Sequence, residues 1–206
     1  MSLVKCELCR MSYVPENPGE VRKHKKHHDE AINGFRAPPS KSEQIIWSRD
    51  DMTITVINQH SPLFLRKRAE KVASIAKRDA RYDFPCYSAK EPISEQNVHV
   101  FLLHKQRRII GLLTMEKHDH IWKTSRADWD ADKKPKELLA HPPMWSICFI
   151  WILKCHRGSH WGQTMVNEAI AYFGENFETI GWYTTFTPSG EAWFHRCCPE
   201  VFYIAK

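Results

Sequence analysis

Hydrophobic residues recur along most of the chain in the patterns of a mixed α/β domain. Residues 51–58 (DMTITVIN) alternate between apolar and polar and are rich in β-branched side chains, so they predict a strand. A helix is predicted to begin at Pro62, because apolar residues then return at helical spacing opposite a basic face. Residues 97–106 and 107–118 predict two further strands joined by a short polar turn.

The second half of the chain continues this alternation. Residues 145–153 (WSICFIWIL) are apolar on both faces, which predicts a strand in the middle of a sheet. A polar loop separates this strand from a helix predicted over residues 163–177. A strand over 181–188, a short helix or turn and a last strand (VFYIA) complete the pattern. The predicted fold class is therefore α/β (α+β).

Composition divides the chain into three zones. Residues 1–36 are rich in Cys, His and Lys, residues 37–44 (APPSKSEQ) predict a polar linker, and residues 45–206 carry the α/β pattern. Within this last zone, residues 119–140 are charged and irregular. We expect them to form an excursion from the domain.

Composition and charge then narrow the class of protein. Apolar residues make up 42% of the 206, enough to build a core, which excludes wholesale disorder. The formal charge of +6 permits a polyanionic partner without requiring one. The longest apolar run, residues 147–153, is far too short to span a membrane, and the N-terminus lacks the apolar region of a signal peptide. We therefore expect an intracellular protein with no membrane contact.

The cysteines point to a metal site near the N-terminus. Seven cysteines are an odd count, unlike a secreted disulfide framework, so the Cys6-x2-Cys9 pair needs an explanation in metal or redox chemistry. His24 and His28 follow and are spaced to share one face of a helix. Two thiolates and two imidazoles suit tetrahedral Zn2+, which would supply most of the folding energy of so small a segment. His27 is a rival ligand at a shorter spacing.

Residues 1–36 therefore predict a zinc finger, but such a finger does not have to recognise DNA bases. Its spacer between Cys9 and His24 is 14 residues, whereas base-reading fingers have about twelve. The basic helix that carries the histidines still permits a weak contact with nucleic acid. We therefore keep a nucleic-acid-binding zinc-finger protein as an alternative function.

A second candidate site follows the central strand. A loop between a strand and a helix, with its amides at the helix N-terminus, is suited to bind pyrophosphate. The spacing from Arg157 to Gly162 resembles the acetyl-CoA signature of the GNAT N-acetyltransferases, with His160 where the middle glycine is expected. The predicted cofactor-binding residues are Cys148, Ile150 and Ile152 of the strand and Arg157, Gly158, Ser159, His160, Trp161 and Gly162 of the loop.

The finger, the linker and the order of the elements together resemble the sister-chromatid cohesion acetyltransferases of the ESCO type. CELCRMSYVPENPGEVRKHKKHH is similar to that family's two-Cys, two-His finger. SICFIWILKCHRGSHWGQTMVNEAI resembles its acetyl-CoA strand, loop and helix, and TTFTPSGEAWFHRCC occupies the place of its late catalytic motif. The resemblance runs over nearly the whole chain.

The resemblance implies a GNAT-type twisted mixed β-sheet flanked by helices, with a small N-terminal ββα-like zinc finger. It implies acetyl-CoA as co-substrate, Zn2+ in the finger, and direct transfer of the acetyl group to a protein lysine in a ternary complex. The expected partner is a protein related to chromatin or cohesin, in the nucleus.

The catalytic residues depart from the family pattern. Its Ser-Asp pair aligns with Thr184 and Thr185, and Thr185 has no carboxylate to accept the proton that a lysine ammonium must lose. Glu116, near the end of the strand over 107–118, is our first candidate for that base, with Glu191 as the second. The predicted catalytic residues are Glu116, Thr184 and Thr185.

Two alternatives to a lysine acetyltransferase follow from these departures. In the first, the acceptor is an amine with a lower pKa than lysine, so that more of it is neutral when it reaches the site. The chain can also be a pseudo-acetyltransferase that keeps the fold and serves as a chromatin-binding or protein-binding module. The Thr184-Thr185 pair and His160 favour this second alternative.

Overall fold

The N-terminal part of the protein is a ββα unit. The computed structural model describes residues 2–38, 40–83, 97–137, 142–184 and 188–205. Strand β1 (Val4–Lys5) pairs antiparallel with β2 (Ser12–Tyr13), and helix α1 (Pro18–Asn33) follows. The side chain of Asn17 caps this helix by accepting hydrogen bonds from the backbone N–H groups of Gly19 and Glu20.

The rest of the described chain forms one ten-stranded sheet with helices on its faces. Its strands run in the order β4-β5-β6-β7-β10-β11-β12-β8-β9, and β3 pairs with β7 outside this path. The strands are β3 (Phe35–Arg36), β4 (Gln44–Arg49), β5 (Met52–Ile57), β6 (Val98–Lys105), β7 (Arg108–His118), β8 (Ile121–Ser125), β9 (Lys136–Glu137), β10 (Met144–Ile152), β11 (Gly181–Tyr183) and β12 (Val201–Ala205). The helices are α2 (Leu63–Ala80), α3 (Arg126–Asp130), the 3-10 turn η2 (Lys154–His156), α4 (Trp161–Tyr172) and α5 (Pro188–Cys197).

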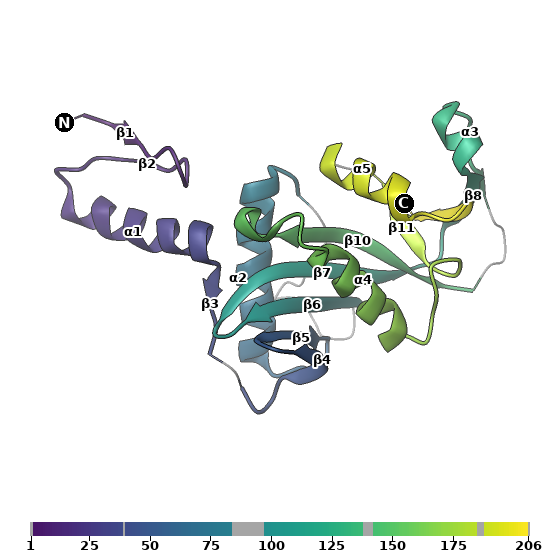
Figure 1. The fold of residues 1–206 in the computed structure, drawn as a ribbon, viewed down its shortest axis with the longest axis horizontal. Helices are drawn as coiled ribbons and strands as arrows, with labels where there is room; N and C mark the ends of the chain where they lie inside the picture. The colour runs from purple at the N-terminus through teal and green to yellow at the C-terminus, as the bar shows by residue number, and fades with distance from the viewer. Residues whose placement is uncertain (1, 39, 84–96, 138–141, 185–187, 206) are drawn as a thin grey trace.

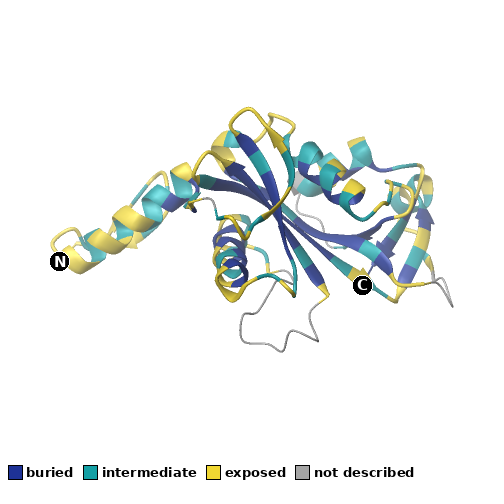
Figure 2. Cartoon of the chain, turned by 90° about the horizontal axis from the view of Figure 1, so that it is seen from below, coloured by how far each residue is buried: buried dark blue, intermediate teal, exposed yellow. Residues whose placement is uncertain are grey.

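The sheet is mixed and twisted, and its two faces are covered by different helices. β11 is parallel to both β10 and β12, whereas the other pairs are antiparallel. α2 lies behind the strands and α4 in front of them in Figure 1, and the twist is visible in the view of Figure 2. This arrangement confirms the predicted fold class.

Strand β10 lies at the centre of the sheet, as its apolar run predicted. It pairs with β7 along nearly its whole length, but it pairs with β11 only at Ser146 and Ile147 among the described residues. A β-bulge at Cys148 interrupts its register with β7 at the same point. Among the described residues, the two central strands β10 and β11 therefore separate after Ile147.

Close approach at this point requires a glycine. A Cβ atom at Gly181 would lie 2.2 Å from the Ser146 Oγ atom, well inside van der Waals contact. Because Gly181 has no side chain, β11 pairs with β10 just before the two strands part.

The expected excursion over residues 119–140 is wrong in part. Residues 121–125 form β8, which pairs antiparallel with the C-terminal strand β12, and α3 follows directly. The pairing joins segments about eighty residues apart, so no local pattern reveals it.

Two other predicted elements have different limits. The helix predicted over 163–177 begins at Trp161 and ends at Tyr172. The strand predicted over 181–188 ends at Tyr183, and residues 185–187 lie outside the described part of the chain.

The finger is fastened to the sheet at the end of α1. Gly34 ends this helix, and β3 then pairs with β7. The Asp29 carboxylate accepts two hydrogen bonds from the Arg108 guanidinium, at 2.6 and 3.1 Å, and Arg108 also donates to the Gly34 carbonyl oxygen. This bidentate pair holds the pKa of Asp29 below its usual range.

A buried histidine makes the stability of the domain depend on pH. The His104 Nε2 atom lies 3.0 Å from the Thr55 Oγ1 atom, and burial lowers the pKa of His104 to about 4. In the unfolded chain this pKa is about 6.5, so between these values the unfolded state binds more protons than the folded state. Acidification from about pH 6.5 to 4 should therefore destabilise the protein.

The variant His104→Gln tests this linkage, because it keeps a hydrogen-bonding group but does not titrate. We expect its Tm to fall less steeply than that of the wild type as the pH is lowered through this range. Thermal melts at a series of pH values measure the difference, and equal slopes would contradict the assignment. His99, whose pKa burial also lowers to about 4, remains in both proteins and contributes to the slope that is left, as do His27, His118 and His156, whose pKa values burial also lowers.

Candidate functional site

The predicted zinc ligands come together in the finger. The ligand atoms of Cys6, Cys9, His24 and His28 all lie within 4.8 Å of one another, and the Cys6 Sγ atom is 3.4 Å from the His28 Nδ1 atom. The His24 Nε2 atom is buried and has no hydrogen-bond partner among the described residues, as expected of a metal ligand. The rival ligand His27 is not part of this group.

The chemistry of these four groups fits Zn2+. The backbone N–H of Cys9 and, next, the His24 side chain lower the pKa of Cys6 to about 6, so its thiol ionises readily. Burial raises the pKa of Cys9, which would lose its proton on binding the metal. The Tyr13 ring stacks on His24 with ring centroids 4.0 Å apart, and this contact fixes the orientation of the imidazole.

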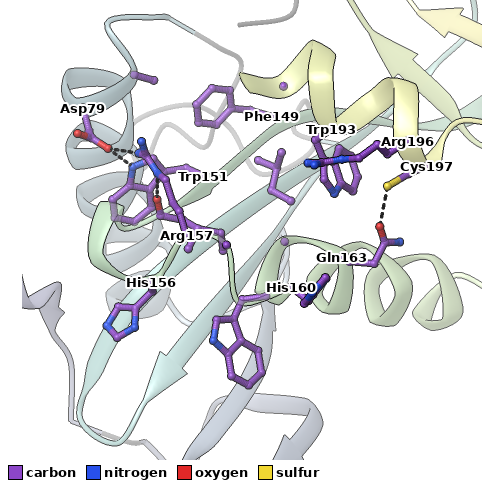
Figure 3. Close-up of a pocket in the computed structure, with 17 residues that line it drawn as sticks. Asp79, Phe149, Trp151, His156, Arg157, His160, Gln163, Trp193, Arg196 and Cys197 are labelled. Carbon is purple, nitrogen blue, oxygen red and sulfur yellow. Dashed lines mark hydrogen bonds and ion pairs between the residues drawn. The ribbon is translucent and has the colours of Figure 1, made fainter. Parts of the chain in front are cut away.

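The second predicted site surrounds a cavity of about 660 Å³. It lies where β10, the loop after it, α4 and α5 meet (Figure 3). Seven of the predicted cofactor residues line it, namely Ile150, Ile152, Arg157, Gly158, His160, Trp161 and Gly162. Cys148 and Ser159 are not among the described lining residues.

The loop before α4 lines this cavity and contains two residues with an unusual backbone conformation. Gly158 and His160 both have left-handed backbone conformations, with φ of 82° and 60°. His160 is the residue before α4, and no side chain caps this helix in the described structure. The N-terminus of α4 thus offers uncapped N–H groups and the positive end of a helix dipole, which together favour a phosphate.

The backbone at His160 is left-handed, a conformation that favours the glycine expected here from the GNAT signature. A residue with a Cβ atom in the left-handed region costs about 1–2 kcal/mol relative to glycine. The loop nevertheless keeps the turn that brings the chain from β10 into α4. The substitution therefore adds strain and an imidazole to the cavity wall without removing the cradle.

Arg157 is held at the cavity wall by an aspartate that the sequence did not indicate. Its Nη2 atom is 2.6 Å from the Asp79 Oδ2 atom, and its Nε atom donates to the Ile152 carbonyl oxygen at 2.8 Å. The same Asp79 oxygen accepts a hydrogen bond from Trp151 Nε1 at 2.8 Å. Asp79 lies on α2, so only the fold brings it to the loop (Figure 3).

Four further residues that line this cavity were not predicted from the sequence as cofactor-binding residues. The helix α5 contributes Gly190, Trp193, Arg196 and Cys197, and Cys197 donates to the Gln163 Oε1 atom of α4 at 2.8 Å. Arg196 adds a second cation to the wall, which suits a ligand with several phosphates.

Glu116 lies beside the point where the central strands separate. On β7 it pairs with Ser146, which in turn pairs with Gly181 of β11. Burial raises the pKa of its carboxyl group, so this group is a stronger base than an exposed glutamate. Its Oε2 atom is 3.8 Å from the His118 Nε2 atom.

The structure describes only part of the segment that aligns with the family's late catalytic motif. Thr184 directly follows β11 and is half-buried, whereas Thr185 lies outside the described residues. The second candidate base, Glu191, lies in the first turn of α5. The catalytic roles of Glu116, Thr184 and Thr185 stay predictions.

The variant Cys6→Ser should lose the zinc of the finger, because it removes the thiol with the lowest pKa in the ligand group. Metal analysis of the purified protein after dialysis would show the loss, while Cys155→Ser, which changes an exposed cysteine outside the group, should retain this ion. A Cys6→Ser protein with unchanged zinc content would contradict the assignment.

Comparisons with known proteins show what the chain is similar to. Residues 1–30 match the family model described as the zinc finger of the acetyl-transferase ESCO. The chain is 21% identical over 194 residues to the N-acetyltransferase ECO1 of Candida glabrata, an alignment that covers 82% of this chain and 72% of the relative.

Two solved structures share the fold. The xEco2 acetyltransferase domain bound to a K105-CoA conjugate is similar with a TM-score of 0.60 and 18% identity, covering 81% of this chain and 98% of the other. A second structure of this domain gives a TM-score of 0.58 at 18% identity, covering 82% and 98%. The finger, the relative and the fold thus support the resemblance stated above: the protein is an N-acetyltransferase that is similar to those of the ESCO type.

Proposed function

We propose that the protein transfers an acetyl group from acetyl-CoA to a lysine of a protein, directly and within a ternary complex. The observation that carries this proposal is the combination of the uncapped α4 N-terminus with the separation of β10 from β11. The first feature suits the pyrophosphate of CoA, and the second leaves the edge of a central strand open to its thioester arm.

The cofactor arm would run along β10. Beyond Ile147 this strand pairs only with β7 among the described residues, so its other edge is open beside Ile150 and Ile152. A backbone N–H of that edge would donate to the thioester carbonyl oxygen and stabilise the negative charge that develops on it. The cavity residues Trp161 and Trp193 would cover apolar parts of the cofactor.

Glu116 would accept the proton of the attacking amine. The neutral amine nitrogen then attacks the thioester carbon, a C–N bond forms, and the C–S bond breaks. The nitrogen gives up its second proton to the departing CoA thiolate, so the products are the amide and CoA as a free thiol. Burial raises the pKa of Glu116, so we expect kcat to rise with pH as this carboxyl group ionises. Thr184 would offer a hydroxyl beside the same opening.

The acceptor class is supported by the relatives. The solved relative carries a CoA conjugate of K105, and the curated relative is named N-acetyltransferase ECO1. Because the chain resembles the sister-chromatid cohesion acetyltransferases, our proposed acceptor is a nuclear, chromatin-related protein. None of the described helices is both long and apolar enough to cross a bilayer.

A catalytically weakened pseudo-acetyltransferase is the second candidate. It is favoured by Thr185 in place of an aspartate and by His160 in place of a glycine. Such a protein would bind acetyl-CoA and a partner protein without transferring the acetyl group. Release of CoA in the presence of a panel of lysine peptides and free amines separates the candidates, since the pseudo-enzyme would release none.

The variant Arg157→Gln should weaken acetyl-CoA binding about 10-fold, the equivalent of one charge-assisted hydrogen bond. Calorimetric or fluorescence titration gives the Kd. Arg49→Gln is the matched control, because Arg49 is an exposed arginine of β4 paired only with its neighbour Asp50 among the ion pairs of the described residues. Equal affinities of the two variants would contradict a role for Arg157.

The variant Glu116→Gln should lower kcat by about 10²-fold, because it removes the proton acceptor at nearly constant size. The KM for acetyl-CoA should change little, since Glu116 does not line the described cavity. Initial rates at several pH values test both statements, and they also test whether the acidic limb of the pH profile disappears. An unchanged kcat would assign the base to another residue, with Glu191→Gln as the next variant.

A further inference from the structure

We propose that the protein has a second metal site, which binds a divalent ion of the Zn2+ class through Glu116, His118 and Cys148. One ligand atom of each lies within 4.8 Å of the others, and the residues range from half-buried to buried. The His118 Nε2 atom is 3.8 Å from Glu116 Oε2 and 3.9 Å from Cys148 Sγ. Ligand atoms of tetrahedral zinc lie roughly 3.3–3.8 Å apart, given its usual bond lengths.

The sheet brings these three side chains to one face. Glu116 and His118 are two positions apart on β7, so their side chains point the same way. Opposite them on β10 lie Ser146 and Met144, and Cys148 follows Ser146 by two positions. Cys148 is the bulged residue, and a bulge re-aims a side chain.

The contacts favour an ion over a nucleophilic triad. In a triad the carboxylate binds one ring nitrogen of the histidine and the nucleophile binds the other. Here the carboxylate and the sulfur both approach Nε2 of His118. Three donors that converge on one point surround a cation rather than relay a proton.

The donor set also indicates which ion. A thiolate, an imidazole and a carboxylate are typical zinc ligands, whereas Mg2+ and Ca2+ prefer oxygen alone. Three protein ligands leave a fourth position for water or another molecule. The Tyr183 ring, 5.6 Å from the ring of His118, forms part of the surrounding wall.

An ion bound here would inhibit the enzyme, a consequence that rests on the proposed function. It would engage the Glu116 carboxylate and so prevent that group from accepting the proton of the amine. The site lies beside the separation of β10 and β11, where the acceptor would enter. We therefore expect reversible inhibition by zinc.

Metal binding is tested on the full chain with its finger already loaded with zinc. Added Co2+ should give a thiolate-to-cobalt absorption band in the wild type, and Cys148→Ser and His118→Gln should each lose it. Cys155→Ser, which changes an exposed cysteine outside both groups, should keep the band. Dialysis against zinc should raise the metal content from about one to about two ions per chain.

A metal content that stays at one ion, or a cobalt band that survives in both variants, would overturn the second site. Circular dichroism shows whether the variants fold. If they do not, the metal content of the wild type, one or two ions per chain, still decides whether the second site exists. In rate assays, zinc should inhibit the wild type and a chelator should restore it. A second ion that binds without inhibiting would leave the site standing and would refute the role of Glu116 as the base.

Discussion

The separation of β10 from β11 is the feature on which the candidate active site depends. The two strands pair at Ser146 and Ile147, with Gly181 allowing their close approach, and then part where Cys148 bulges. In the described part of the chain, the edge of β10 beyond this point is unpaired in the middle of the sheet. The cavity is lined by β10 beyond this point and by the N-terminus of α4, and Glu116 pairs with β10 just before it.

Two arginines contribute positive charge to the same region. Arg157 is fixed by Asp79 and by the Ile152 carbonyl oxygen, and Arg196 enters from α5. A polyanionic cofactor would thus meet oriented donors, which lowers the entropy that binding must offset. The finger is fastened elsewhere, through Arg108 and Asp29 at the far end of β7, so it is positioned without entering the cavity.

Local patterns in the sequence predicted the features that depend on neighbours along the chain. The four finger ligands, the central strand and the loop before α4 are each contained in a short segment with its own spacing. Contacts between distant segments were not predictable in this way. Asp79 reaches Arg157 across 78 positions, and β8 pairs with the C-terminal strand β12, about eighty positions away. The bulge that aims Cys148 is likewise a property of two paired strands.

The central claim is that the opening between β10 and β11, with the cradle at α4, binds acetyl-CoA. Calorimetric titration of the 206-residue chain with acetyl-CoA tests it most directly. The account predicts a saturable heat with a stoichiometry of about one, in line with a single cavity at this place in the described residues. The absence of any binding heat across temperatures would contradict it, because neither the enzyme nor the pseudo-enzyme could then use this site.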